Sequence, residues 1–177
     1  MKPFSTYNRL FTTLAVLFSI YGAEAQTAPA LPRLVVNVMI DQLRSDYMEA
    51  FFPLYGDRGF RRLMQEGCMY TNAEYPFARP DRASATACLH SGTTPYDNGI
   101  PAERWLDRQS LRPIYCVDDK NYQGHLTAEN SSPLYLGVST IGDELKVATE
   151  GKGIVLSISP FRDAAILSAG HAADACF

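Results

Sequence analysis

The stretch LVVNVMID, residues 34–41, is the strongest fold signal in the chain. Its first seven residues are nearly all apolar and rich in β-branched side chains, which predicts a central β-strand buried on both faces. The run ends at Asp41, which would lie at the carboxyl end of that strand, where open α/β sheets place their ligand sites. Asp41 is therefore a candidate metal ligand, although an aspartate at a strand end also commonly serves as a cap or turn residue.

Outward from this stretch, helical and strand-like patterns alternate. Apolar residues recur at helical spacing before Gly67, Asp81 precedes a second helix, and Thr140 and Asp143 form a capping box before a third. We expect helices at residues 59–66, 82–90 and 141–149, strands at residues 68–74, 114–117 and 154–158, and another strand beginning at residues 165–168. This alternation predicts an α/β domain with a mainly parallel sheet.

The first 25 residues have the pattern of a secretory signal peptide. Lys2 and Arg9 are followed by an apolar run at residues 10–23 and by the cleavage pattern Ala23-Glu24-Ala25. A membrane anchor is the alternative, but polar residues dilute the run and a spanning helix needs about 20 apolar residues. We expect residues 26–177 to form the mature domain, in the periplasm or outside the cell, with no membrane contact after cleavage.

Composition and charge narrow the function classes. The chain has 177 residues, 46% of them hydrophobic and 20% charged, and a formal net charge of -3. These values are ordinary for a globular domain and exclude a disordered acidic tail. An isoelectric point near 5.6 without a Lys/Arg run argues against a nucleic-acid partner. In an exported chain the four cysteines allow three disulfide pairings, which the sequence leaves open together with the oligomeric state.

The start of the helix at residues 82–90 is the second candidate site. Backbone amides at a helix start favour an anion, but Asp81 as N-cap would satisfy the same donors. Ser84 and Thr86 are the hydroxyl groups in this turn, and Arg82 is free to pair with an anion or with Asp81. The three histidines are scattered without metal-binding spacing.

Four segments together resemble exported zinc phosphatases of the alkaline phosphatase superfamily, of the type found in Bacteroidota and related to type I phosphodiesterases/nucleotide pyrophosphatases. They are LVVNVMIDQLRSDYMEAFFPLYGDRGFRRLMQEGCMYTNAEY (residues 34–75), SGTTPYDNGIPAERWLD (91–107), IYCVDD (114–119) and AAILSAGHAADACF (164–177). The resemblance implies an alkaline phosphatase-like α/β fold with helices on both faces of the sheet. It also implies Zn²⁺ as cofactor, bound by Asp41, and a small phosphate ester as substrate.

The resemblance also shows departures at the site. The family's nucleophilic threonine falls at Arg82, and a guanidinium group cannot attack phosphorus or bind zinc. A phosphate-binding asparagine falls at Glu103, and of a later basic pair only Arg162 remains. A two-zinc site needs about six protein ligands, whereas this chain has three histidines. We therefore expect an incomplete, N-terminal part of a longer protein, with at most part of one metal site.

Three hypotheses follow. The first is an exported, metal-dependent phosphoric ester hydrolase in which Asp41 binds zinc, Ser84 is a displaced nucleophile, and Arg82 and Arg162 contact the phosphate. The second is a catalytically inactive relative that holds an anion with Arg82 and Arg162. The third is purely structural, with both arginines paired to Asp81, Glu103 and Asp163. Because both family residues have changed to opposite charges, we predict that Arg82 and Glu103 form an ion pair in the former phosphate pocket.

Overall fold

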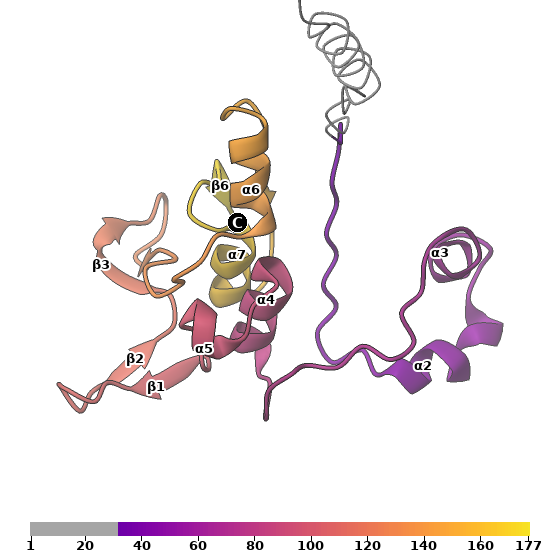
Figure 1. Ribbon diagram of the computed structural model, residues 1–177, viewed down its shortest axis with the longest axis horizontal. Helices are drawn as coiled ribbons and strands as arrows, with labels where there is room; N and C mark the ends of the chain where they lie inside the picture. The colour runs from indigo at the N-terminus through magenta and orange to yellow at the C-terminus, as the bar shows by residue number, and fades with distance from the viewer. Residues whose placement is uncertain (1–31) are drawn as a thin grey trace, which may run out of the picture. The chain divides into compact units, whose positions relative to one another are not determined.

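The computed structural model describes residues 32–177, so the expected signal peptide lies outside the described residues. The chain divides into two units, residues 1–35 and 36–177, and every described helix and strand belongs to the second (Figure 1). Its helical elements are α2 (Ser45–Ala50), η1 (Phe52–Leu54), α3 (Phe60–Glu66), α4 (Arg82–Ser91), α5 (Pro95–Asn98), α6 (Ile141–Ala148) and α7 (Arg162–Ala169). None of the helices in the described part has the length and apolar character of a membrane span.

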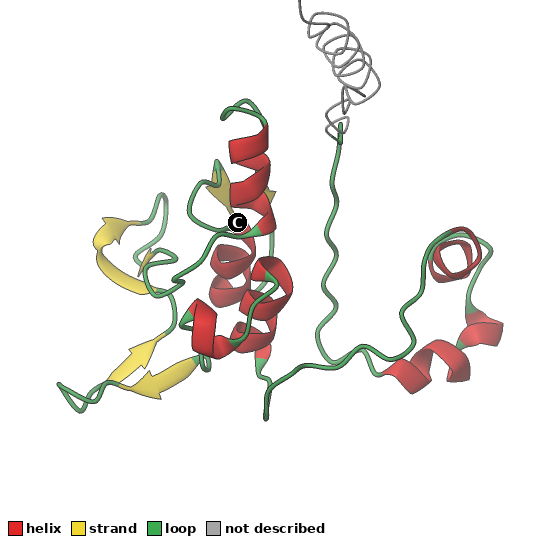
Figure 2. Cartoon of the chain, in the orientation of Figure 1, coloured by secondary structure: helices red, strands yellow, loops and turns green. Residues whose placement is uncertain are grey.

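Five helical elements come first along this unit, four strands follow, and only the last four elements, α6, β5, α7 and β6, alternate (Figure 2). The strands are β1 (Arg104–Leu106), β2 (Pro113–Tyr115), β3 (Asp118–Gln123), β4 (Asn130–Ser131), β5 (Leu156–Ser157) and β6 (Ala175–Cys176). Within residues 32–177 they form three two-stranded sheets. The pairs β1–β2 and β3–β4 are antiparallel, whereas β5 and β6 are parallel, with α7 forming the connection between them.

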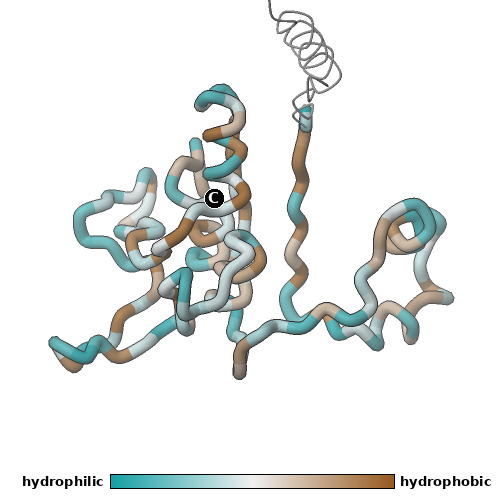
Figure 3. The backbone as a smooth tube through the Cα atoms, viewed as in Figure 1, coloured by the Kyte–Doolittle hydropathy of each residue, from teal (hydrophilic) through white to brown (hydrophobic). Residues whose placement is uncertain are grey.

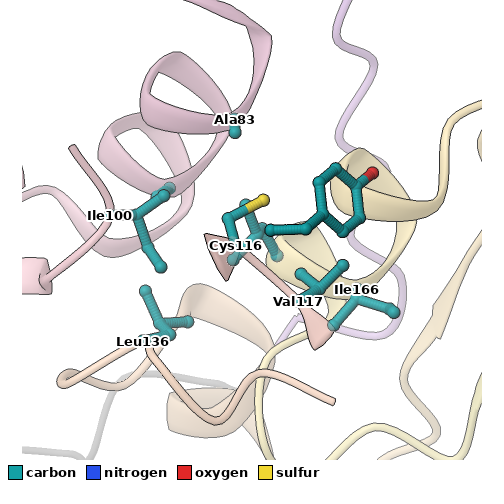
Figure 4. Packing of buried hydrophobic residues seen from close by; sticks show 9 residues of the cluster. Ala83, Ile100, Cys116, Val117, Leu136 and Ile166 are labelled. Atoms are coloured by element: carbon teal, nitrogen blue, oxygen red, sulfur yellow. The ribbon is translucent and has the colours of Figure 1, made fainter. Parts of the chain in front are cut away.

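The core lies where α4 and α7 pack against the segment that follows β2. Ala83 and Ala87 of α4 are completely buried in this core, and their small side chains allow α7 to approach closely. Larger apolar side chains fill the space beside them, as Figure 4 shows. They come from Ile100, Tyr115, Cys116, Val117, Leu136, Ile166 and Leu167.

The predicted strand at residues 34–40 is not a strand in the described part of the chain. The segment is extended but unpaired, and its even-numbered residues are exposed, with Val36 70% and Val38 73% accessible. Figure 3 shows the hydrophobic character of this stretch. Only Met39 of this segment is less exposed, and Asn37 and Met39 contact α4. A strand needs a neighbour to receive its backbone hydrogen bonds, and none of the described segments lies beside this one to do so.

Other expectations are partly corrected. The helices at residues 59–66, 82–90 and 141–149 are confirmed to within a residue or two. The capping box of α6 and Asp81 as N-cap of α4 are also confirmed, and in α4 Ser84 completes a capping box that was not expected. Residues 68–74 hold no strand, and residues 154–158 form only the two-residue β5. The strand expected from residue 165 is wrong: these residues lie in α7, whose alanine and leucine content favours a helix.

Gly170 terminates α7 at a position where no other residue fits. Its φ of +81° lies in the left-handed region, and an added Cβ would overlap Thr140 Oγ1 and lie 2.5 Å from Asp143 Oδ2. Thr140 and Asp143 form the capping box of α6. The close approach of Gly170 therefore joins the end of α7 to the start of α6.

We expect Gly170→Ala to lower the free energy of unfolding by clearly more than about 1 kcal/mol, because backbone strain and steric overlap act together. Gly151→Ala is the matched control, since Gly151 has a φ of +78° but nothing within 4 Å of the added Cβ. Thermal unfolding of the two variants measures the difference. Equal losses of stability would contradict the packing argument.

Candidate functional site

Arg82, the first residue of α4, is held by two carboxylates. Its Nε lies 3.0 and 3.2 Å from the two carboxylate oxygens of Asp163, and its Nη2 donates to Glu103 Oε2 at 3.1 Å. The Asp163 side chain is fully buried, whereas the Arg82 side chain is 20% exposed. The guanidinium also lies over the Phe161 ring, 3.9 Å from its centroid. The predicted Arg82–Glu103 ion pair is thus confirmed, and Asp163 is the more buried partner.

Asp81 fixes the geometry of this cluster without contacting Arg82. Its Oδ1 accepts the Ser84 N–H at 2.8 Å, and its Oδ2 accepts the Glu103 N–H at 2.6 Å. One carboxylate therefore caps α4 and also holds the backbone that carries Glu103. Neither this second bond nor the Phe161 contact is visible in the sequence, because no local pattern marks it.

The hydroxyl groups at the start of α4 are buried and already bonded. Ser84, the expected displaced nucleophile, donates from Oγ to Asp81 Oδ1 at 2.7 Å and accepts the Asp81 N–H at 3.0 Å. Thr86 donates to the Arg82 carbonyl oxygen at 2.7 Å. Both side chains are no more than 1% exposed. A nucleophile must reach its substrate, and in this arrangement both hydroxyls serve the helix instead.

Arg162 belongs to a different cluster. Its Nη1 donates to Glu129 Oε2 at 2.5 Å and to Ser131 Oγ at 3.0 Å, and its Nη2 donates to Asp118 Oδ1 at 3.2 Å. Its guanidinium lies 4.5 Å from the centroid of the Tyr115 ring. Arg162 therefore joins the start of α7 to the β3–β4 hairpin. Its acceptors are Glu129, Ser131 and Asp118, and none of them is a carboxylate that holds Arg82.

Asp41 follows the extended segment that lies along α4. Asn37 Nδ2 is 3.1 Å from His90 Nε2, and Thr86 Oγ1, which donates to the Arg82 carbonyl oxygen, lies 3.4 Å from Met39 Sδ. From Asn37 to Met39 the segment advances by two residues, while the contacted residue of α4 moves back by four, from His90 to Thr86. The segment therefore runs toward the start of α4. The extended conformation ends at Ile40, and Asp41 begins a turn.

A metal ion has few ligands in this part of the chain. No group of three or more His, Cys, Asp or Glu side chains in the described residues is arranged to hold one. Burial raises the pKa of Tyr75, and the charges of Cys88 and Asp41 raise it further. The Tyr75 phenol is thus close enough to the Asp41 carboxylate to be affected by its charge. By themselves, the described residues do not fit the expected zinc site.

Charge around Arg82 is dominated by carboxylates. Burial by itself would lower the pKa of the Arg82 guanidinium, but the Asp163 hydrogen bond and the charges of Asp163 and Glu103 raise it overall. Burial, followed by the charges of Asp163, Glu103 and Asp81, raises the pKa of Cys116 to about 12. Two carboxylates thus contact the Arg82 guanidinium, and that of Asp81 lies close by without contacting it. All four cysteines, including Cys116, are free thiols, so none of the three possible disulfide pairings is present.

Comparisons with known proteins agree on one family. The sequence profile described as type I phosphodiesterase / nucleotide pyrophosphatase matches residues 35–151. The chain is 35% identical to the alkaline phosphatase PhoV of Synechococcus elongatus, over 95% of this chain and 33% of PhoV. It is 31% identical to the alkaline phosphatase PafA of Elizabethkingia meningoseptica, over 88% of this chain and 29% of PafA.

A crystal structure of PafA has a similar fold. It matches with a TM-score of 0.81 and 30% identity, over 85% of this chain and 30% of the PafA chain. The likeness confirms the expected incomplete α/β fold of the alkaline phosphatase type. The chain spans about a third of the length of the curated relatives it matches.

We expect Arg82→Leu to lower the free energy of unfolding by about 3–5 kcal/mol, because it leaves the fully buried Asp163 carboxylate unpaired. The double variant Arg82→Leu/Asp163→Leu should recover a large part of that loss. Arg62→Ala is the control, since the Arg62–Glu66 pair is about two-thirds exposed and contributes less than about 1 kcal/mol. Urea unfolding of the four proteins tests this, and similar losses for Arg82→Leu and Arg62→Ala would argue against the buried pair.

Cys116 should resist alkylation in the folded chain at pH 8, because a thiol with a pKa of about 12 is almost entirely protonated there. The exposed Cys68 should react readily with iodoacetamide under the same conditions. Mass spectrometry of the labelled peptides separates the two sites. Labelling of Cys116 at the rate of Cys68 would show that the pocket is open.

Proposed function

The chain belongs to the type I phosphodiesterase/nucleotide pyrophosphatase family of the alkaline phosphatase superfamily, and we propose that it is a member without hydrolytic activity at this site. In this proposal the phosphatase fold acts as a structural module, and an internal ion pair fills the former phosphoryl pocket. The fold and family are shared with hydrolases, whereas the side chains at the start of α4 differ in chemistry.

One observation carries the proposal: the Arg82 guanidinium contacts both oxygens of the buried Asp163 carboxylate and also reaches Glu103. An arginine–carboxylate pair of this kind is strong and geometrically specific. It occupies the position at which the family resemblance places the nucleophile. The alternative hydroxyl, Ser84 Oγ, is 0% exposed and bonded to Asp81.

The contacts also argue against storage of an anion at this site. Arg82 already faces two carboxylates, and Asp81 adds a third close by. A phosphate dianion would have to displace a buried carboxylate and would be repelled by the others. Arg162 is similarly engaged by Asp118 and Glu129. We therefore favour the structural form of the inactive protein over the anion-binding form.

A metal-dependent phosphoric ester hydrolase is the second candidate, favoured by the alkaline phosphatases among the relatives. In that case Asp41 would bind zinc, Ser84 would attack phosphorus, and a small phosphate ester would be the substrate. Zinc would supply Lewis-acid activation. Among the described residues Asp41 would be one ligand, and no full ligand set accompanies it.

Under both candidate functions we propose that the protein is exported. The basic start, apolar run and Ala23-Glu24-Ala25 pattern support cleavage after residue 25 and delivery to the periplasm or the medium. N-terminal sequencing of the secreted chain from a bacterial host would test this, and the proposal requires Gln26 as its first residue.

Hydrolysis of an aryl phosphate with added Zn²⁺ separates the candidates. We expect the full chain, Ser84→Ala and Asp41→Ala all to hydrolyse the ester no faster than buffer, with circular dichroism confirming that each is folded. Arg108→Ala, in the exposed turn after β1, is the matched control for surface substitution. Hydrolysis by the unaltered chain that Ser84→Ala abolishes and Arg108→Ala leaves intact would establish the hydrolase and refute the inactive module.

A further inference from the structure

His171 joins three segments at the end of the molecule where α7 terminates. It follows Gly170, and its Nδ1 lies 3.3 Å from Asp143 Oδ2 at the start of α6. Its Nε2 lies 3.0 Å from the carbonyl oxygen of Leu136 in the loop that precedes α6. The next residue, Ala172, donates its N–H to Asp143 Oδ1 at 2.7 Å. The C-terminal turn is thereby attached to both α6 and the preceding loop.

Both partners of the imidazole are acceptors. An ionised carboxylate and a backbone carbonyl have no proton to offer, so each contact requires an N–H on the ring. A neutral imidazole has one N–H, whereas an imidazolium has two. We propose that His171 is a pH-sensitive clasp, which holds the loop and α6 together as an imidazolium and gives up one of its two contacts when it loses a proton.

The charged groups around His171 fit this arrangement. On α6, Asp143, Lys146 and Glu150 face the same open cavity of about 640 Å³ that His171 lines. Lys146 is paired with Asp174 at 2.8 Å, in the turn that follows His171. The loop residues 136–139 that line this cavity carry no titratable side chain. Asp143 is therefore the one charged group of this set that contacts the ring.

Asp143 remains ionised throughout the range in which histidine titrates. Burial raises the pKa of its carboxyl, but the N–H groups of Thr140 and Ala172, with the His171 and Thr140 side chains, outweigh burial and lower it below its ordinary value. The carboxylate is thus a constant acceptor above about pH 5. The His171 side chain is 45% exposed, so protons of the solvent can reach it without unfolding.

Loss of the proton has a structural consequence. The ring then keeps its bond to Asp143 or to the Leu136 carbonyl, and the other acceptor is released. The Leu136 side chain is 2% exposed and belongs to the core. Leu136 and His171 both line the cavity, and they are joined through the Leu136 carbonyl oxygen. Release at the carbonyl would remove the contact by which His171 holds the loop before α6.

Urea unfolding of the full chain between pH 5.5 and 8.5 tests the clasp. If the folded chain holds a proton at His171 that the unfolded chain loses, stability must fall as pH rises. We expect the urea midpoint of the unaltered chain and of His125→Gln, an exposed histidine, to fall across this range by similar amounts. The midpoint of His171→Gln should change much less with pH. The difference between the two proteins corresponds to the uptake of up to about one proton per molecule on folding.

Nitrogen-15 NMR of the unaltered chain gives an independent readout, which does not depend on how well the variant folds. The proposal requires both ring nitrogens of His171 to show imidazolium shifts at pH 6, with a single protonated nitrogen at pH 8.5. A neutral ring at pH 6, or equal pH dependence in His171→Gln and His125→Gln, would overturn the clasp.

Discussion

The described structure depends on one buried ion pair, between the Arg82 guanidinium and the Asp163 carboxylate. It joins the first residue of α4 to the first turn of α7, the two helices whose small residues form the centre of the core. Glu103, just before β1, pairs with the same guanidinium. The Asp81 carboxylate accepts the backbone N–H of Glu103 and so holds this segment in place. Removing Arg82 would leave the fully buried Asp163 carboxylate unpaired, so the two helices and the β1 segment are coupled energetically.

The same ion pair determines what the pocket can do chemically. A phosphoryl-transfer site needs an accessible nucleophile and positive groups directed at the phosphate. Here the hydroxyls of Ser84 and Thr86 are buried within α4, and the positive charge of Arg82 is directed at carboxylates. The family fold is retained because it rests on apolar packing, helix capping and the α4–α7 contact, which tolerate a change of polar chemistry at one edge.

Sequence patterns predicted the local features and one tertiary contact. The capping boxes at Asp81 and Thr140 involve residues three apart, so the sequence contains all of their determinants. The Arg82–Glu103 pair followed from two charge changes in one family pocket. Asp163 was named as an arginine partner in the structural hypothesis, but its contact through both carboxylate oxygens with Arg82 Nε, the Phe161 contact and the double use of Asp81 depend on tertiary packing and have no local signature. The segment at residues 34–40 has strand composition, but strand formation depends on a pairing neighbour rather than on composition alone.

The most direct test of the closed pocket is the NMR signal of the Arg82 Nε–H. With Nε held against the buried Asp163 carboxylate, this proton should exchange slowly with water at neutral pH, and its signal should stay unchanged when inorganic phosphate is added. Rapid exchange, or a shift that saturates with phosphate concentration, would show that the guanidinium is free to bind an anion and would contradict the account.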